Sequence, residues 1–257
     1  MPMLNKYLSG ELSPLDRSQP VWGLLASFVW LVVILFVFIN IQMLIVSLLI
    51  TREHGLVPLE EFKQLVTDYR FDGTVIPPAM LGSTVVCSLL LIIAIKLKNK
   101  SKLTHYLGIK AVSPRTSGYW LLIAASYLIA IALSAYIFDR QPVAQSVLAI
   151  YTSAESKLIL CIALIVAAPI FEECVFRGFL QTGISRSCLG PIAGILIPAM
   201  VWAGMHSQYD LYDLSVIFVM GLILGAARFR TDSVLLTIGL HALFNGLSTL
   251  EVAIYTA

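Results

Sequence analysis

Six polar side chains lie within otherwise apolar stretches of the last hundred residues. They are Glu172, Glu173, Arg177, His206, His241 and Asn245. Ionisable side chains within an apolar, membrane-spanning segment are costly, and they therefore indicate a functional site. A carboxylate can act as a general base, while imidazole and carboxamide groups can both donate hydrogen bonds to one oxygen. The residue types alone therefore suggest acid–base chemistry inside an apolar environment.

The two adjacent glutamates are expected to play different roles. On a helix their side chains point about 100° apart, so they cannot serve one pocket equally. Glu173 and Arg177 stand at i, i+4, the spacing of a helical ion pair. That pair leaves Glu172 free, and desolvation makes an unpaired carboxylate a stronger base. The alternative is a Glu–Arg pair that only orients neighbouring helices.

The histidines are less specific signals. His241 and Asn245 also stand at i, i+4, so both side chains lie on one helical face. The alternative for this pair is a hydrogen bond between helices. His206 follows Trp202 by four residues, near the end of an apolar run, and by itself could simply face water.

The composition indicates an integral membrane protein. Of 257 residues, 58% are hydrophobic and 12% are charged, whereas soluble proteins carry about 25% charged residues. The net charge of +2 is too small to indicate a nucleic-acid partner. The four cysteines form no CxxC pair and are expected to be core thiols.

Seven apolar runs are long enough, or nearly so, to be transmembrane helices. They are Val21–Ile50, Val75–Ile95, Gly118–Phe138, Leu158–Thr182, Leu189–His206, Leu214–Ala227 and Val234–Ile254. An eighth span follows if the long first run is broken. The predicted fold is an all-α, polytopic transmembrane helix bundle with a polar cavity in its C-terminal half.

The charges of the connections predict an orientation. One connection holds six basic residues and no acid: Lys96, Lys98, Lys100, Lys102, Lys110 and Arg115. Basic connections stay in the cytoplasm, so this connection and the N-terminus are predicted inside. Arg186, Arg228 and Arg230 then fall on the same side, and Asp210 and Asp213 fall outside. The chain is thus predicted to be a multi-pass plasma-membrane protein.

Two connections are expected to contain amphipathic helices. After Pro58, apolar residues recur at i, i+3, i+4 and i+7 between charged ones: Phe62, Leu65, Val66 and Tyr69. This pattern is typical of a helix that lies on the membrane surface. The stretch Gln141–Ala154 is a weaker version.

Three motifs in order resemble a known family. Glu-Glu-x-x-x-Arg, aromatic-x-x-x-His and His-x-x-x-Asn resemble the CAAX-protease and bacteriocin-processing (Abi) family of intramembrane glutamate endopeptidases. The resemblance runs from about Leu158 to Leu250, with Trp202 where the family usually has Phe. It implies a catalytic core at 158–257, preceded by transmembrane helices and amphipathic connections at 1–157.

The resemblance also implies the roles of the residues. Glu172 would activate water with help from His206, and His241 and Asn245 would stabilise the oxyanion. Glu173 and Arg177 would support them. The implied substrate is a membrane-associated peptide or a prenylated protein in the lipid bilayer, cleaved without a cofactor.

Three alternatives remain open at this point: a non-catalytic immunity or scaffold protein, a transporter, and a zinc enzyme using Glu172, His206 and His241. Zinc is disfavoured because its ligands would come from three separate spans. One tension also remains, because the span boundaries place Glu172 and His241 near mid-membrane but His206 near the outer face. Either the fifth span is shifted or distorted, for example around Pro198, or His206 lies in a different layer from the other two residues.

Overall fold

Long apolar runs become helices because a helix satisfies every backbone polar group within its own segment. The computed structural model describes residues 20–98, 101–141 and 143–257, and no strand occurs within these ranges. In chain order the helical elements are α2 (Leu24–His54), α3 (Leu59–Asp68), η1 (Tyr69–Phe71), α4 (Ile76–Leu97), α5 (Leu103–Leu107), α6 (Pro114–Ile137), α7 (Gln145–Ser153), α8 (Lys157–Cys161), η2 (Ile162–Ala167), α9 (Ala168–Glu173), η3 (Cys174–Leu180), α10 (Gln181–Ser185), α11 (Gly190–Gly204), α12 (Leu211–Thr231) and α13 (Val234–Tyr255).

Six helices in the described part of the chain are long and apolar enough to cross a membrane. They are α2, α4, α6, the continuous segment Lys157–Ser185, α12 and α13. The prediction of an all-α transmembrane bundle is confirmed, but a count of seven or eight spans is not. The fifth predicted span is α11, which has only 15 residues. Its length of about 22 Å is less than the roughly 30 Å of a hydrocarbon core.

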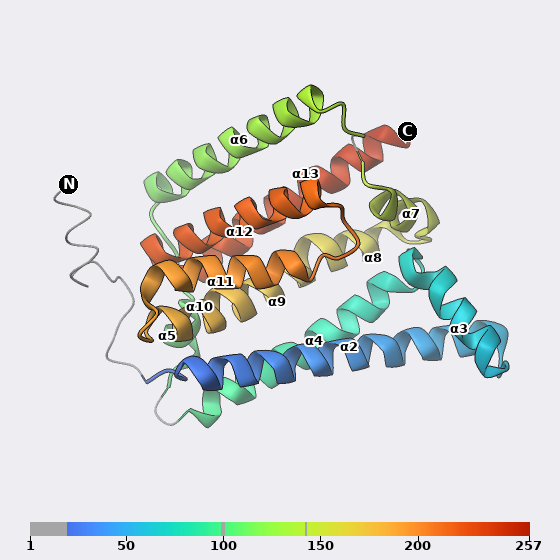
Figure 1. Ribbon diagram of the computed structural model, residues 1–257, viewed down its shortest axis with the longest axis horizontal. Helices are drawn as coiled ribbons and strands as arrows, with labels where there is room; N and C mark the ends of the chain where they lie inside the picture. Colours follow the sequence, from blue (N-terminus) through green and yellow to red (C-terminus); the bar gives the residue numbers. More distant parts are fainter. Residues whose placement is uncertain (1–19, 99–100, 142) are drawn as a thin grey trace.

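The helices pack around one main core (Figure 1). Helices α2 and α4 lie side by side, α9 to α13 form the centre, and α6 lies at the opposite edge. The core cluster mixes residues from both parts of the chain, such as Ile34 and Leu91 with Phe176, Trp202 and Leu240. Stacking of Phe38 on Phe171 joins α2 directly to the helix that carries the two glutamates.

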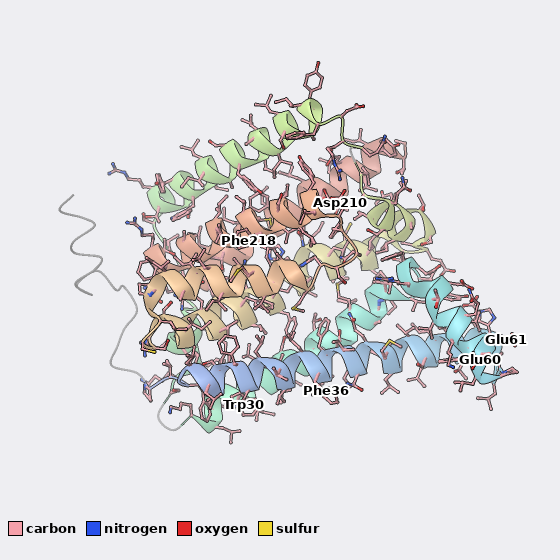
Figure 2. The ribbon with its side chains drawn as sticks, in the orientation of Figure 1. Trp30, Phe36, Glu60, Glu61, Asp210 and Phe218 are labelled. Carbon is pink, nitrogen blue, oxygen red and sulfur yellow. The ribbon has the colours of Figure 1, made fainter. Side chains whose placement is uncertain are left out.

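One end of the bundle collects the basic connections, and we call it the basic end. The connection between α4 and α6, the turn after α10 and the turn between α12 and α13 all lie there (Figure 1). It is held together by polar contacts: Val234 N–H donates to Gly108 O, and Lys110 pairs with Asp232 at 3.1 Å. The α11–α12 connection, with Asp210, lies at the opposite end (Figure 2).

The predicted amphipathic helix is α3, and its apolar face has a protein partner. Phe62, Leu65, Val66 and Tyr69 pack against a small second core that includes Val46, Ile50, Val75 and Ala79. Helix α2 has 31 residues, or about 46 Å, so its C-terminal part exceeds the hydrocarbon thickness by about 15 Å. The sequence pattern revealed the helix but not this contact. Glu60 and Glu61 lie at the outer tip of the part that α3 and the C-terminal end of α2 form together (Figure 2).

Candidate active site

The two glutamates end α9, between two π-helical turns. The segment from Lys157 to Ser185 is one continuous helix, but η2 precedes α9 and η3 follows it with the wider π-helical register. Such wide turns are rare and occur frequently at functional sites. Glu173 is fully buried, whereas the side chain of Glu172 is 22% exposed. The two carboxylates therefore have different environments, as the sequence predicted.

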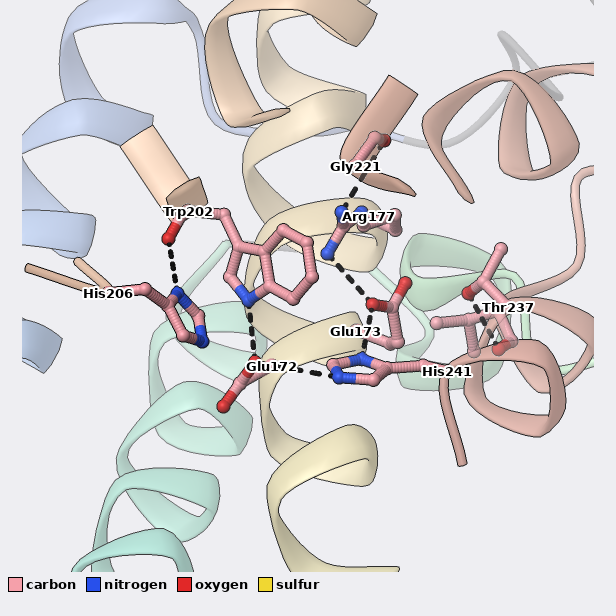
Figure 3. A network of polar contacts seen from close by, with 9 residues as sticks. Glu172, Glu173, Arg177, Trp202, His206, Gly221, Thr237 and His241 are labelled. Carbon is pink, nitrogen blue, oxygen red and sulfur yellow. Dashed lines mark hydrogen bonds and ion pairs between the residues drawn. The ribbon is translucent and has the colours of Figure 1, made fainter. Parts of the chain in front are cut away.

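Glu173 is the centre of a buried cluster. Its Oε1 accepts a hydrogen bond from Arg177 Nη1 at 2.8 Å, so the predicted i, i+4 ion pair is confirmed. The same oxygen lies 3.0 Å from His241 Nδ1 (Figure 3). A carboxylate paired with arginine only accepts hydrogen bonds, so Nδ1 of His241 carries a hydrogen. This contact fixes the His241 ring and leaves Nε2 facing the other glutamate.

Arg177 also connects the cluster to two other helices. Its Nη2 donates to the carbonyl oxygen of Gly221 in α12 at 3.4 Å, and its guanidinium lies 4.5 Å from the ring centroid of Trp202 in α11. The side chain of Arg177 is only 1% exposed. Its charge is thus satisfied within the protein by Glu173, a carbonyl and an aromatic face.

Glu172 is held from the other side by Trp202. The indole Nε1–H donates to Glu172 Oε2 at 2.5 Å, and the same oxygen lies 4.0 Å from His241 Nε2 (Figure 3). The Trp202 ring makes edge contacts with both histidine rings, with 5.2 Å between centroids in each case. From the sequence, Trp202 was expected only to replace the Phe that is usual in the family that the motifs resemble. A buried indole N–H usually has a hydrogen-bond partner, which was the signal that could have indicated this bond.

The short helix α11 explains why His206 reaches the site. Helices α10 and α11 form an antiparallel hairpin, and Glu172 and Trp202 lie at similar distances along the chain from its turn. Because α11 ends at Gly204, His206 follows within two residues, and its Nδ1 contacts the carbonyl oxygen of Trp202, whose indole reaches Glu172. The fifth span was expected to end at His206, and α11 ends two residues earlier, at Gly204. The contact of the His206 ring with Trp202 brings His206 to the side of Glu172.

The tautomer of His206 follows from its partner. Its Nδ1 lies 2.8 Å from the carbonyl oxygen of Trp202, which can only accept, so Nδ1 carries the hydrogen. In the neutral ring, Nε2 then has a free lone pair. On its other side the ring stacks on Tyr209, with centroids 6.2 Å apart and planes 24° apart. Sequence reasoning did not single out Tyr209.

Asn245 has a different partner from the one that we expected. Its Nδ2 donates to the carbonyl oxygen of Leu164 at 2.8 Å, in the π-helical turn η2. In a π-helical turn each carbonyl accepts a hydrogen bond from the N–H five residues later, as Ala163 O does from Ala168 N–H. By the same rule the carbonyl oxygen of Leu164 would accept from the N–H of residue 169. That residue is Pro169, which has none. Asn245 thus satisfies a backbone group that the proline leaves open, and only the second hydrogen of its amide remains for another acceptor.

The predicted residues therefore form one connected group, apart from Asn245. Glu172, Glu173, Arg177, His206 and His241 are linked directly or through Trp202. Within residues 20–98, 101–141 and 143–257, no three His, Cys, Asp or Glu side chains are grouped so that they could hold a metal ion.

A polar hollow lies beside this group. It has a volume of about 270 Å³ and is lined by the α6–α7 and α11–α12 connections, including Tyr209. The sequence predicted a polar cavity in the C-terminal half. The hollow lies at the end of the bundle and is shared with residues 140–141 and 143–146, which precede that half.

Comparison with known proteins agrees with the motifs. Residues 154–247 match the family described as type II CAAX prenyl endopeptidase Rce1-like. The resemblance is confirmed over this segment. The Rce1-like segment contains all the site residues described above, and its family is one of CAAX endopeptidases in membranes.

One relative shows the same similarity at lower coverage. A protein of Escherichia coli, named only as an uncharacterized 24.3 kDa protein, is 38% identical over 82 residues, or 31% of this chain. The match spans 38% of that relative's own length. No solved structure gives a significant match to the chain.

Proposed function

We propose that this chain is an intramembrane endopeptidase in which Glu172 activates water. The proposal rests on the different environments of two adjacent carboxylates. Glu173 is buried and paired with Arg177, whereas Glu172 is partly exposed and has one oxygen positioned between an indole and an imidazole. Pairs of carboxyl groups in contrasting environments are typical of sites that divide acid–base roles.

The gap between Glu172 and His241 fits a nucleophilic water. Their facing atoms, Oε2 and Nε2, are 4.0 Å apart, which is too long for a hydrogen bond. One water can lie about 2.8 Å from both atoms and bridge them. Glu172 would take a proton from this water while the oxygen attacks the carbonyl carbon of the peptide. The same proton would then pass to the leaving amine nitrogen.

His241 is our proposed donor to the oxyanion. With its Nδ1–H held by Glu173, a proton on Nε2 would point to the region in front of Glu172, and Glu173 would be its counter-ion. A preorganised donor of this kind contributes about 3–4 kcal/mol to the barrier. Asn245 could assist only through its second amide hydrogen. His206, with a lone pair on Nε2, would accept a hydrogen from the water and help to orient it.

The proposed substrate is a membrane-associated peptide or a prenylated protein. The family match supports a membrane-associated peptide as the substrate, and the apolar helices long enough to span a membrane are consistent with a site within the bilayer. We also propose that the basic end lies in the cytoplasm of a plasma-membrane protein, because basic connections are retained there.

The decisive experiment compares Glu172→Gln with Glu251→Gln. The amide retains the shape of Glu172 but cannot accept a proton from water, so membrane-peptide turnover should fall at least 100-fold. Glu251, a partly exposed carboxylate near the end of α13, is the matched control and should leave turnover unchanged. Peptide profiles of membranes from cells that express each variant provide the readout. Wild-type profiles with Glu172→Gln would instead support a non-catalytic scaffold role.

A further inference from the structure

The polar hollow beside the site is built by two connections far apart in sequence. One wall is formed by residues 140–141 and 143–146, before and at the start of α7, and the other by residues 208–210 and Asp213, before and at the start of α12. Its volume of about 270 Å³ is below the roughly 300–1,000 Å³ of pockets that enclose a whole small molecule. The hollow therefore suits one or two side chains of a longer chain.

The charges of the hollow favour a cation. Among its described lining residues there are two carboxylates, Asp210 and Asp213, and one cation, Arg140. Arg140 pairs with Asp210 and lies 4.0 Å from Asp213, so one negative charge remains uncompensated. Asp210 is already engaged, because it also caps α12 through a hydrogen bond from Asp213 N–H at 3.0 Å. The carboxylate of Asp213, 32% exposed, is therefore the one available to a ligand.

Neutral polar groups complete the lining. Gln141 and Gln145 come from one wall, and Gln208 comes from the other. Carboxamides offer both donors and acceptors, which suits the backbone of an extended peptide as well as an ammonium group. The hollow thus combines one excess negative charge with peptide-like hydrogen-bonding groups.

A chain of aromatic contacts connects the hollow to the catalytic carboxylate. Tyr209 lines the hollow and stacks on His206, the His206 ring contacts Trp202, and Trp202 donates to Glu172. Burial and the negative charges of Asp213 and Glu172 raise the pKa of Tyr209, which is consistent with a position between the two carboxylates. With a rise of about 3.3 Å per residue, an extended peptide covers this route within about five residues.

We propose that the hollow binds a lysine or arginine side chain of the peptide substrate, within about five residues of the bond that Glu172 attacks. This inference rests on the proposed function, because it names the substrate class of the same site. Asp213 would accept from the cationic group, and the carboxamides would contact the flanking backbone. The protein would thereby select peptides with a basic flank next to an apolar segment.

Binding without turnover tests this inference separately from catalysis. We would use the full chain in detergent with Glu172→Gln, and three fluorescent peptides that are identical except at two equivalent positions. Lysine, norleucine or glutamate would stand five residues from the centre of the apolar segment, on both sides. We expect the lysine peptide to bind about fivefold more tightly than the norleucine peptide in anisotropy titrations, as for a partly exposed ion pair.

The variants localise the effect. Asp213→Asn should remove the preference for lysine and Asp213→Glu should retain it. Glu61→Gln, which removes the same charge from exposed α3 at the same end of the bundle, should not change it. Gln145→Lys, which places a cation of the chain in the hollow, should also abolish the preference if Asp213→Asn does not fold. The inference would be overturned if the three peptides bound with equal affinity, if the glutamate peptide bound best, or if none of them bound. It would also be overturned if Glu61→Gln reduced the preference for lysine as much as Asp213→Asn does.

Discussion

Replacing Arg177 by methionine should destabilise the protein strongly, because it leaves a buried carboxylate without its ion-pair partner. Glu173 is fully buried, and without Arg177 its Oε1 would retain the contact with His241 but lose its charged partner. Removing one member of a buried pair costs about 3–5 kcal/mol. The contact of the guanidinium with the Trp202 ring is lost as well. We therefore expect a loss of about 3–5 kcal/mol in the free energy of unfolding.

The double variant Glu173→Gln, Arg177→Met separates charge from packing. With both charges removed, no unpaired ion remains in the core, and stability should return to within about 1–2 kcal/mol of the wild type. Glu173→Gln alone should be destabilised, because it leaves the arginine buried without its carboxylate. The two substitutions should therefore be strongly non-additive.

The control is an ion pair of equal length at the surface. Lys63 and Glu60 lie 2.8 Å apart on α3, the same distance as Arg177 and Glu173, but both are exposed. Lys63→Met should leave stability almost unchanged. Unfolding would be followed by circular dichroism while SDS replaces a mild detergent. If Arg177→Met costs less than about 1 kcal/mol, or the double variant is no more stable than Arg177→Met, the reasoning from burial is refuted.

Three further outcomes are expected. Asn245→Ala should lower the free energy of unfolding by about 1–3 kcal/mol in the same assay, because the carbonyl of Leu164 loses its hydrogen-bond donor. Adding Pro169→Ala supplies a backbone N–H and should recover part of this loss. No recovery would contradict the argument from the π-helical register. Turnover by purified protein should survive exhaustive EDTA and phenanthroline, whereas a loss restored by stoichiometric zinc would make the histidines ligands. With Cys188 replaced by serine, a cysteine at Lys102 should react only from the cytoplasm and one at Asp210 only from outside; the reverse labelling would invert the proposed topology.

The sequence predicted what depends on composition and helical period. Apolar runs of about 20 or more residues without charge are long enough to span a membrane, so the positions of α2, α4 and α6 were predictable. The Glu173–Arg177 pair was predictable for a similar reason, since i, i+4 residues meet on any helix. These inferences need no knowledge of how the helices are packed.

Contacts between helices could not be predicted in this way. The bond from Trp202 to Glu172 depends on where α11 ends, and an apolar run gives a helix end only to within a few residues. The partner of Asn245 depends on the wider turn before Pro169, and hydropathy carries no signal for such a turn. The sequence thus identified the polar residues of the site but not which of them hold the others in place.

The shortness of α11 has a consequence for the surrounding lipid. Its neighbours α12 and α13 have 21 and 22 residues, or about 31–33 Å, so α11 ends about 9 Å before the rim that they reach. Acyl chains next to α11 must shorten, or headgroups and water must follow the backbone inward. We therefore expect the bilayer to be thinner next to α11, so that the thickness of the membrane should affect the region around Glu172. A thinner membrane would relax the indentation, whereas a thicker one would oppose it.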